Sequence, residues 1–530
     1  MTLRIKTLTL SIPEMAATEA IHKTLSDKLS VPKEDIYNIQ IRKKSLDARK
    51  KGHAVFRLQV DFSARDEKKL LGLYSDLEEA APFNIQDPLE DLEYKKAKFR
   101  HPPVIIGSGP AGTFAALTLA RAGIKSVIVE RGEAVEQRFR TGNRLRREGI
   151  LNTESNFCFG EGGAGTFSDG KLTCGRNHPL IRHIFTELVR FGAPDDILYE
   201  AHPHIGTDYL MQVAQDIRRH LTEMGTEYLF EKRMVDFSTG SSQAKYLVHL
   251  HDGSKIPTDH LILAIGHSAR DTYKRLKEKN VHMLPKPFAM GARIEHPQEL
   301  INEIQFGSCQ LPLAAEYKLT AQTGSRGIWT FCMCPGGHLL PTSAQDGHLA
   351  INGMSYHARN SGFANAAVVV GVSKDDFFRD DVLDGMYFQE KIEQKAFKEG
   401  GGKYFSPAQR LKDFIAGRAS KGELQSTYKP GVNSSRLDHI LPDFASTALR
   451  AALEDYNRRM KGFISDKALI VGVESKTSAP VSIARSDSFE SLSHPGLFPT
   501  GEGAGFAGGI VSAALDGVRV GQAVIRNALV

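Results

Sequence analysis

A glycine-rich turn between two short apolar runs is the feature that most constrains the fold of this 530-residue chain. Residues 103–112 read PVIIGSGPAG, and one helix length later residues 127–130 read VIVE. In a strand–turn–helix–strand unit of this kind, Gly107 permits the tight turn, Gly109 lets the backbone approach a pyrophosphate and Gly112 lets the helix pack on the strand. The pattern predicts a doubly wound α/β domain that binds a dinucleotide.

The acid at the end of the second apolar run narrows the choice of dinucleotide. Glu130 stands where a carboxylate accepts hydrogen bonds from the hydroxyls of an adenosine ribose. Its charge would repel a 2′-phosphate, so we expect FAD or NAD and not NADP. The helix that begins after Gly109 is expected to direct its free N–H groups and the positive end of its dipole at the phosphates.

Two further segments favour FAD. Residues 497–502, LFPTGE, predict a short buried strand ending in a glycine and an acid, and the glycine-rich turn at 503–510 leads into a helical pattern that reaches Ile525. Residues 261–267, LILAIGH, predict the apolar strand and glycine with which such a fold returns to its cofactor. This arrangement resembles the FAD-dependent oxidoreductases of the glutathione-reductase-like class. In that class a Gly-Asp pair near the C-terminus holds the ribityl chain and the next helix points at the flavin; Glu502 replaces the usual Asp here.

A narrower resemblance rests on three other segments. Residues 159–172, 331–337 and 352–355 are similar to those of a bacterial family of uncharacterised FAD-dependent dehydrogenases, nearly end to end along the chain. The resemblance implies a bound FAD and an oxidoreductase, and it names no substrate. In the resembling flavoproteins a loop placed like residues 162–166 touches the flavin, and we favour that role over a plain turn. The residues expected to bind FAD are Gly107, Ser108, Gly109, Pro110, Ala111, Gly112, Glu130, Arg131, Gly163, Ala164, Gly165, Thr166, Gly266, Gly501, Glu502, Gly508, Gly509 and Ile510.

The expected architecture is a glutathione-reductase-like FAD-binding Rossmann domain with an inserted α+β substrate or cap domain and an N-terminal ferredoxin-like α+β module. Residues 54–62 alternate between apolar and polar side chains, as a half-buried strand does. The module follows the order βαββα, in which the last helix is expected over residues 66–79. The expected boundaries are 1–80 for the module, 81–102 for a polar linker, 103–280 and 466–530 for the two parts of the FAD-binding domain, and 281–465 for the inserted domain.

Two residues are candidates for catalysis. Lys476 lies just before the last FAD segment, where a lysine near the isoalloxazine would stabilise the negative charge of reduced flavin. His338 follows the turn at residues 335–337, whose N–H groups beside an imidazole would bind an anionic substrate or orient a hydride donor. Cys332 and Cys334 are expected to point to one face of a buried strand as packing residues. No second cysteine pair completes a metal site, so we expect no metal.

Other polar residues stand in apolar or glycine-rich surroundings and would supply an acid, a base or an anion clamp. Taken singly, each is better explained as a structural ion pair or a buried histidine. These residues are Arg293, Glu295, His296, Asn352, His357, Arg359 and Glu474.

The patterns together predict an FAD-dependent oxidoreductase of the dehydrogenase type, which transfers a hydride between flavin and a small-molecule substrate held between the FAD domain and the inserted domain. Because only one dinucleotide fingerprint is present, the electrons come from the substrate, from NAD(P)H that visits the flavin without a domain of its own, or from an electron-transfer protein. The alternatives are a flavin-dependent RNA-modification enzyme, a flavin monooxygenase that uses transient NAD(P)H, and a non-catalytic flavin-binding protein.

Composition favours a cytoplasmic location. The net charge of +6 is small for this length, and five cysteines are too few for a secreted disulfide framework. No run approaches the ~18 apolar residues of a membrane span. One cluster of basic residues surrounds Asp47 in an expected hairpin loop, where a solvated loop is favoured over a docking surface for RNA or an acidic protein. It consists of Arg42, Lys43, Lys44, Arg49, Lys50 and Lys51.

Overall fold

The larger part of the molecule contains a five-stranded parallel sheet. The computed structural model describes residues 1–15, 19–81, 85–240, 244–308 and 311–529. Neighbouring strands pair in the order β23-β11-β5-β6-β7, and every pair is parallel. The strands are β5 (Val104–Ile106), β6 (Val127–Val129), β7 (Glu227–Leu229), β11 (Leu261–Leu263) and β23 (Leu497–Pro499). The strand–turn–helix–strand unit expected from the glycine pattern is therefore confirmed.

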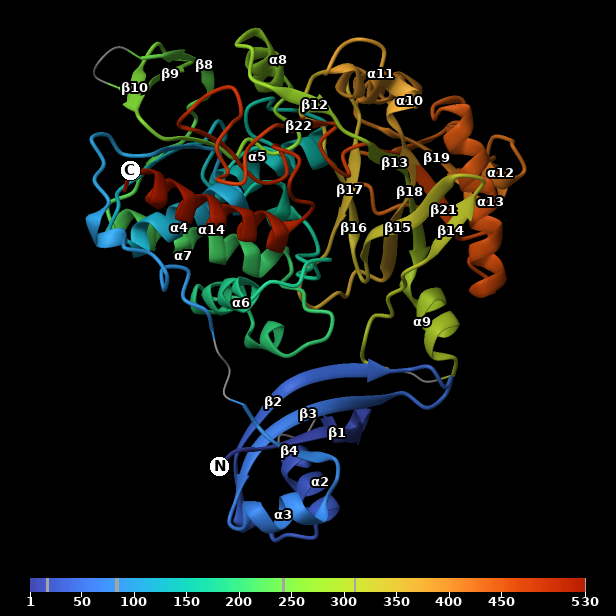
Figure 1. The fold of residues 1–530 in the computed structure, drawn as a ribbon. Helices are drawn as coiled ribbons and strands as arrows, with labels where there is room; N and C mark the ends of the chain where they lie inside the picture. The colour runs from blue at the N-terminus through green and yellow to red at the C-terminus, as the bar shows by residue number, and fades with distance from the viewer. Residues whose placement is uncertain (16–18, 82–84, 241–243, 309–310, 530) are drawn as a thin grey trace.

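Two helices that are far apart in the sequence pack side by side on this sheet. α4 (Pro110–Arg121) joins β5 to β6, and α14 (Ile510–Asn527) follows β23 (Figure 1). A Cβ added at Gly517 would lie 2.1 Å from the carbonyl oxygen of Ala111, and one added at Gly521 would lie 2.8 Å from Cβ of Thr118. The two helices approach this closely only because glycine stands at both positions. The neighbouring helices are α5 (Val135–Glu148), α6 (Leu180–Arg190), α7 (Thr207–Glu223) and α8 (Arg270–Glu278).

A small antiparallel meander lies between β7 and β11 in the sequence. It consists of β8 (Met234–Thr239), β9 (Tyr246–Leu250) and β10 (Lys255–Thr258), in the order β10-β9-β8. The strand just before it in the sequence does not belong to the meander. That strand is β7, and it pairs with β6 in the parallel sheet instead.

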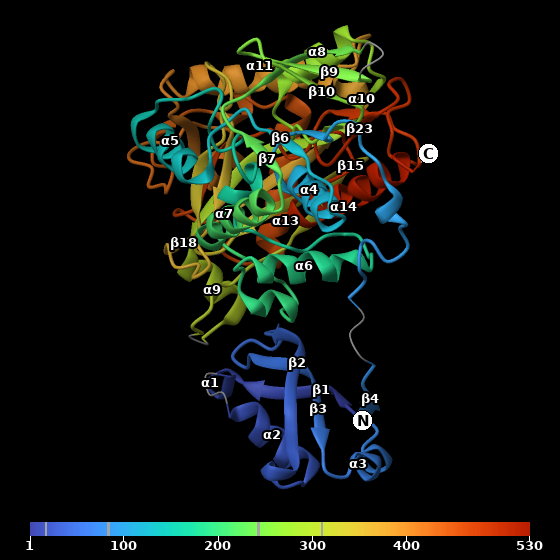
Figure 2. The same cartoon turned by 90° about the vertical axis from the view of Figure 1, so that its left-hand side faces the viewer.

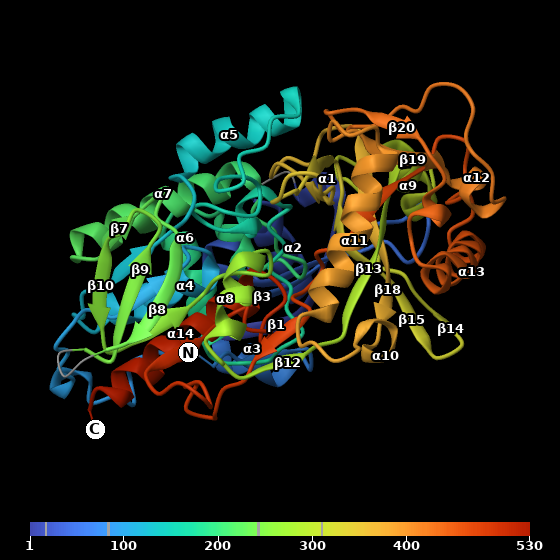
Figure 3. The same ribbon diagram turned by 90° about the horizontal axis from the view of Figure 1, so that it is seen from above.

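The second large sheet has seven strands in the order β14-β15-β18-β13-β21-β19-β20. Its neighbours are antiparallel except for β19 and β20, so the sheet is mixed. α13 (Asp443–Arg459) covers the face that is turned away from the parallel sheet (Figure 3). The strands are β13 (Phe288–Pro297), β14 (Thr320–Thr323), β15 (Arg326–Cys334), β18 (Phe363–Val372), β19 (Ser406–Arg410), β20 (Val432–Ser434) and β21 (Leu469–Glu474).

The other face of this sheet carries the hairpin of β16 (His338–Pro341) and β17 (Ile351–Met354), which lies toward the parallel-sheet domain (Figure 1). A short antiparallel pair, β12 (Met283–Pro285) and β22 (Val481–Ile483), lies where the chain enters and leaves this part of the molecule. The remaining helices are α9 (Gln298–Phe306), α10 (Lys374–Phe377), α11 (Asp384–Glu399) and α12 (Leu411–Ile415). The boundary predicted between residues 465 and 466 falls before β21, which pairs with β13 and β19, so the sheet extends to Glu474.

The N-terminal module contains a separate antiparallel sheet in the order β2-β3-β1-β4 (Figure 2). The alternating residues of β3 (Val55–Ala64) lie in its core as predicted, with Leu58, Val60 and Phe62 buried. The helix expected over residues 66–79 ends early, because the last residues form a fourth strand that pairs with β1. The other elements are β1 (Leu3–Ser11), α1 (Ile12–Met15), α2 (Ala20–Leu29), β2 (Ile36–Asp47), α3 (Glu67–Leu73) and β4 (Leu77–Glu79).

The basic cluster lies on strand β2 and the turn after it, and not wholly in a loop as predicted. Arg42 binds the buried Asp61, and Arg49 binds Asp47. Lys44 contacts the body of the molecule: its Nζ lies 2.7 Å from Glu200, and its backbone exchanges hydrogen bonds with Tyr199 and Ala201. Half of the cluster is thus engaged in internal ion pairs.

Within the described ranges, no helix is both long enough and apolar enough to cross a bilayer. Ala17, expected on a helical face, and Cys309 lie outside the described residues.

The module should be removable without loss of FAD, because it has its own buried core of residues such as Leu3, Leu25 and Phe62. We expect a chain lacking residues 1–80 to fold and to purify with the same flavin content per chain as the full-length protein, measured by absorbance after denaturation. Loss of flavin or aggregation of the shortened chain would contradict this, and would mean that the module stabilises the body through contacts such as that of Lys44.

Candidate active site

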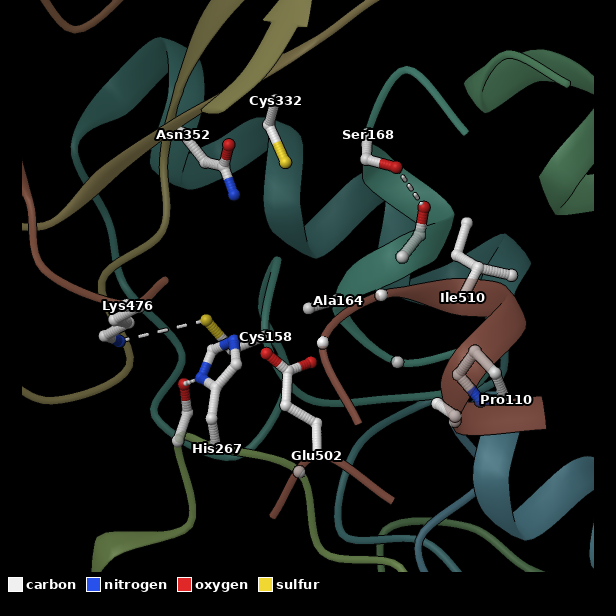
Figure 4. Close-up of a pocket in the computed structure, with 18 of the residues that line it drawn as sticks. Pro110, Cys158, Ala164, Ser168, His267, Cys332, Asn352, Lys476, Glu502 and Ile510 are labelled. Carbon is white, nitrogen blue, oxygen red and sulfur yellow. Dashed lines mark hydrogen bonds between the residues drawn. The ribbon is translucent and has the colours of Figure 1, made fainter. Parts of the chain in front are cut away.

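A single cavity of about 700 Å³ lies between the parallel-sheet domain and the seven-stranded sheet. Its lining includes Gly109 at the start of α4, Ile510 at the start of α14 and Cys332 of β15. Figure 4 shows Asn352 and Cys332 on one side of this space and His267 and Glu502 on the other. The volume lies within the ~300–1,000 Å³ range of small-molecule sites.

The N-termini of two helices open into this cavity. α4 begins after Gly109, and α14 begins after Gly509. Each N-terminus offers free backbone N–H groups and the positive end of a helix dipole. Since the packing of α4 on α14 brings both ends to one place, the cavity suits a ligand with negative charge.

Five glycines leave this part of the cavity open. A Cβ at Gly266, Gly508 or Gly509 would meet no protein atom within 4 Å, and a Cβ at Gly109 would meet only Gly163, at 3.6 Å. All five positions line the cavity. The open space is therefore bordered by bare backbone, into which a flat or charged group can fit closely.

Glu130 lines the cavity and is also engaged in hydrogen bonds within the chain. Its carboxylate accepts hydrogen bonds from N and Oγ of Ser108, at 2.9 and 2.8 Å, and from the backbone N of Gly132 and Gly160, both at 3.0 Å. A carboxylate has about four acceptor positions, and these four donors occupy them. Glu130 thus holds the first glycine turn against the loop at residues 160–165, and a ribose hydroxyl would have to replace one of these donors.

Sequence reasoning missed the residue that shapes this second loop. Arg138 of α5 is fully buried and donates to the carbonyl oxygens of Asn156, Glu161 and Gly163. Burial lowers its pKa to about 10, which still leaves it charged at neutral pH. A Cβ at Gly160 would lie 2.4 Å from Cδ of Arg138, so glycine is required there. An arginine in an otherwise polar helical segment carried no sequence signal for this role.

Among the described residues, Gly501 is held by a buried contact, and the side chain of its neighbour Glu502 is not. The backbone N of Gly501 donates to Asp516 of α14 at 2.7 Å, and Asp516 in turn pairs with Arg485. Glu502 faces the cavity, and its carboxylate accepts no hydrogen bond from any described residue. Burial raises the pKa of Glu502 to about 7, and the charge of Lys286 offsets only part of this rise. An unpartnered carboxylate in this position is ready to accept hydrogen bonds from a ligand.

Lys476 reaches the cavity, as expected for a catalytic candidate. Its Nζ donates to the carbonyl oxygen of Thr342 at 2.9 Å and lies 3.8 Å from Sγ of Cys158 (Figure 4). Nearby, Nδ1 of His267 lies 2.7 Å from Oγ of Ser268. Burial, with the charges of Lys476 and Arg270, lowers the pKa of His267 to about 3, so its imidazole stays neutral.

His338 does not line the cavity. Its ring lies against Tyr356. Burial, with the nearby charges of Arg146 and Lys429, lowers the pKa of His338. His338 opens β16, and the next two residues, Leu339 and Leu340, are buried in the core. The structure therefore places His338 away from the cavity, and its catalytic role stays a prediction.

Cys332 and Cys334 both line the cavity but differ in exposure. Between Phe331 and Cys334, three steps along β15 oppose two along β18, so the strand contains a bulge. Cys332 has φ +42° and is exposed to the cavity, whereas Cys334 is buried. Burial raises the pKa of the Cys334 thiol to about 11. Cys334 is buried as predicted for a packing residue, whereas the bulge leaves Cys332 exposed, since strict alternation holds only where the ladder is regular.

Arg293 holds the residues on this side of the cavity in place through hydrogen bonds. It is fully buried and donates to Oδ1 of Asn352 at 2.6 Å, to the carbonyl oxygen of Cys332 at 2.5 Å and to Oδ1 of Asn365 at 2.9 Å. Its ion-pair partner is Glu474, at 3.1 Å. Arg293 and Glu474 form the structural ion pair favoured from the sequence, while Asn352 reaches the cavity.

Most of the predicted cofactor residues line the cavity, and four do not. Ser108 binds Glu130, Gly112 lies against Gly107, Thr166 accepts from Thr207, and Gly501 binds Asp516. These four support the cavity through the backbone instead. The predicted residues that line it are Gly107, Gly109, Pro110, Ala111, Glu130, Arg131, Gly163, Ala164, Gly165, Gly266, Glu502, Gly508, Gly509, Ile510 and Lys476. Among the residues described, no group of three or more His, Cys, Asp and Glu is placed to hold a metal ion.

Comparisons with known proteins decide the family. Residues 287–477 match the family described as "FAD-dependent protein, C-terminal domain-like", residues 101–151 match an FAD binding domain, and residues 2–63 match a domain of unknown function. A protein of Clostridium beijerinckii, described only as uncharacterized, is 42% identical over 534 residues, which cover 99% of each chain. The chain belongs to a family of bacterial FAD-dependent proteins. It is thus a member of the FAD-binding oxidoreductase superfamily, and its cofactor is FAD.

Solved structures give weaker likenesses to this FAD-dependent protein. The glycerol-3-phosphate dehydrogenase from Bacillus halodurans, complexed with FAD, is 13% identical with a TM-score of 0.36, covering 82% of this chain and 66% of that chain. Glycine oxidase from Bacillus cereus is 10% identical with a TM-score of 0.35, covering 80% and 94%. At TM-scores below 0.5, neither likeness supports a conclusion about activity here.

The residues at the cavity fit FAD. The two helix N-termini and the glycine cradle at Gly109 and Gly163 match a diphosphate, and the unpartnered carboxylate of Glu502 matches a group rich in hydroxyls.

Replacing Gly109 by valine should give colourless protein. Gly109 has φ −73° and ψ −179°, which valine adopts without strain, and its Cβ would meet only Gly163 at 3.6 Å. Any loss of FAD would therefore come from side-chain bulk in the cavity. Flavin content per chain measures the outcome, with Gly175→Val as the control because a Cβ there meets nothing within 4 Å. A Gly109→Val protein that retains full flavin would show that this turn does not approach the cofactor.

Glu502→Gln should stabilise the flavin-free protein more at pH 8 than at pH 5. Burial raises the pKa of Glu502 in the folded protein to about 7. At a pH below the pKa of the unfolded chain, the carboxyl is protonated in both states and does not affect stability. As the pH rises from that value through about 7, ionisation increasingly favours the unfolded chain, so the folded protein is destabilised. Melting temperatures at the two pH values measure the difference between variant and parent. The exposed Glu303→Gln is the control, and an equal shift at both pH values in Glu502→Gln would contradict the raised pKa.

Proposed function

We propose that this protein is an FAD-dependent oxidoreductase of the dehydrogenase type, which transfers a hydride between flavin and a small molecule held at the inserted-domain end of the cavity. The observation that carries the proposal is the continuity of the cavity from the N-termini of α4 and α14 to Cys332 and Asn352. When bound, FAD supplies an acceptor or donor for two electrons and a proton. We assign the parallel-sheet domain to the glutathione-reductase-like class and the N-terminal module, with its βαββαβ order, to the ferredoxin-like topology.

The diphosphate, the ribityl chain and the flavin ring system each have a matching group in the chain. The N–H groups at the start of α4, with Gly109 and Gly163, would bind the diphosphate. Glu502 would accept hydrogen bonds from ribityl hydroxyls, and the N-terminus of α14 would place its positive dipole end beside the ring system. Arg138 would act indirectly, by holding the carbonyl groups of the 160–165 loop in place.

Lys476 is the proposed source of positive charge at the reacting end. Its ammonium group is fixed by Thr342 and lies in the cavity wall near His267, which is neutral. A fixed cation in a site closed to bulk water stabilises negative charge that develops during reaction. The neutral His267 can hydrogen-bond there without adding a second charge.

Two structural observations bear on the alternatives. Among the described residues there is one parallel sheet of the doubly wound type, so NAD(P)H would have to reach the cavity without a domain of its own. The basic cluster, the only sequence support for RNA modification, uses Arg42, Lys44 and Arg49 in internal ion pairs. The dehydrogenase proposal is therefore preferred to the RNA-modification alternative.

Lys476→Met should retain FAD but slow its reduction by about 100-fold, the order of effect seen when one preorganised charge-stabilising group is removed. Stopped-flow absorbance under anaerobic conditions, with each substrate found by a metabolite screen for flavin bleaching and with NADH and NADPH, measures the rate. Lys476→Arg keeps the charge and is the matched control. Equal reduction rates in Lys476→Met and the parent would remove this role, and a protein whose flavin no donor reduces would contradict the dehydrogenase proposal.

A further inference from the structure

The inserted-domain end of the cavity presents an amide whose orientation is determined by its neighbours. Oδ1 of Asn352 accepts from Nη1 of Arg293 at 2.6 Å and from the backbone N of Gly353 at 2.7 Å. Both donors act on the oxygen, so the amide N–H₂ group is directed away from them. Figure 4 shows it pointing into the cavity beside Cys332. Among the described residues, Nδ2 of Asn352 has no hydrogen-bond acceptor.

A cation from the parallel-sheet domain lines the same end. Nζ of Lys171 lies 3.1 Å from Glu316 and 3.3 Å from Asp169. An ammonium group has three N–H donors, so one remains after these two contacts. Lys171 and Asn352 come from different domains, and both line the cavity.

The two carboxylates at this end already have partners. Asp169 is bound by Arg359 at 2.6 Å and by Oγ of Ser355, and Glu316 is bound by His202 as well as by Lys171. Burial opposes the ionisation of Asp169, but Lys171 and Arg359 outweigh it and hold its pKa below the usual range. Lys318, which is exposed, adds a further positive charge to the lining. The end of the cavity therefore offers donors and positive charge to a ligand.

Tyr317 adds one more donor without a partner. It is 5% exposed, it lines the cavity, and its OH has no hydrogen-bond partner among the described residues. A buried hydroxyl without a partner costs free energy unless a ligand or water satisfies it.

We propose that this end of the cavity binds the carboxylate group of a small organic acid, with Nδ2 of Asn352 and Nζ of Lys171 as the donors. The inference rests on the proposed function, because it names the substrate class of the same site. A carboxylate offers two oxygens and one negative charge, which matches two donors that come from two different domains. A phosphate monoester carries up to two charges, so inorganic phosphate is included among the probes to distinguish the two kinds of anion.

Asn352→Asp gives a sharp test because it preserves shape. Aspartate can still accept from Arg293 and Gly353, so folding and flavin content should be kept, but the donor is replaced by a second acceptor with negative charge. Asn457→Asp is the matched control: Oδ1 of Asn457 accepts from the backbone N of Ile464 at 2.9 Å, and the residue lies outside the cavity lining. Lys171→Met removes the second donor, and Lys171→Arg retains its charge.

The measurement is binding to the FAD-loaded protein, read from changes in the flavin absorbance spectrum and from the melting temperature. The probes are a panel of small mono- and dicarboxylates, the primary amide of each, and inorganic phosphate. We expect at least one carboxylate to bind at least about tenfold more tightly than its amide. Asn352→Asp and Lys171→Met should each weaken that binding by about tenfold or more, with no change in Asn457→Asp.

Three results would overturn the inference: a carboxylate and its amide that bind equally, phosphate binding without any carboxylate binding, or carboxylate binding that Asn352→Asp leaves unchanged. The proposed function is tested separately by flavin reduction. Carboxylate binding that depends on Asn352, in a protein whose flavin no donor reduces, would support the site and contradict the dehydrogenase. Flavin reduction by a substrate without a carboxylate group would support the dehydrogenase and contradict the carboxylate site.

Discussion

The close packing of α4 on α14 is the contact on which the site depends. The two helices are far apart in the sequence, and they touch because Gly517 and Gly521 let the backbone of one approach Ala111 and Thr118 of the other. Their common direction brings two N-termini to one end of the sheet, where the glycine turns after β5 and β23 leave open space. A single steric condition thus produces both the shape and the positive potential of the cofactor end of the cavity.

The other end of the cavity depends on a buried charge. Arg293 distributes its donors over β17, β15, β18 and β21, so four segments of the inserted domain are held by one guanidinium group. Its planar set of five donors suits this task, which lysine could not perform. Through this arrangement Asn352 and Cys332 reach the cavity, although Arg293 itself does not.

The two sheets contribute different kinds of groups to the site. The parallel sheet carries its functional groups on turns at the ends of its strands, where backbone N–H groups are available. The mixed sheet presents side chains from one of its faces, which suits recognition of a small molecule. Loops such as the one at residues 160–171 connect the two, since they contribute Gly163 to one end of the cavity and Lys171 to the other.

The sequence by itself determined the parallel sheet, the glycine turns, the FAD cofactor and the family, because these features rest on local patterns: aliphatic runs of strand length, glycines at fixed spacing and an acid at a strand end. It also placed Lys476 correctly at the cavity. Only the tertiary structure decided which polar groups meet. The bulge that separates Cys332 from Cys334, the placement of His338 outside the cavity, the support of the glycine loop by Arg138 and the pairing of Asn352 with Arg293 all depend on contacts between distant segments. Such contacts follow from strand register and packing, which a pattern within one segment does not contain.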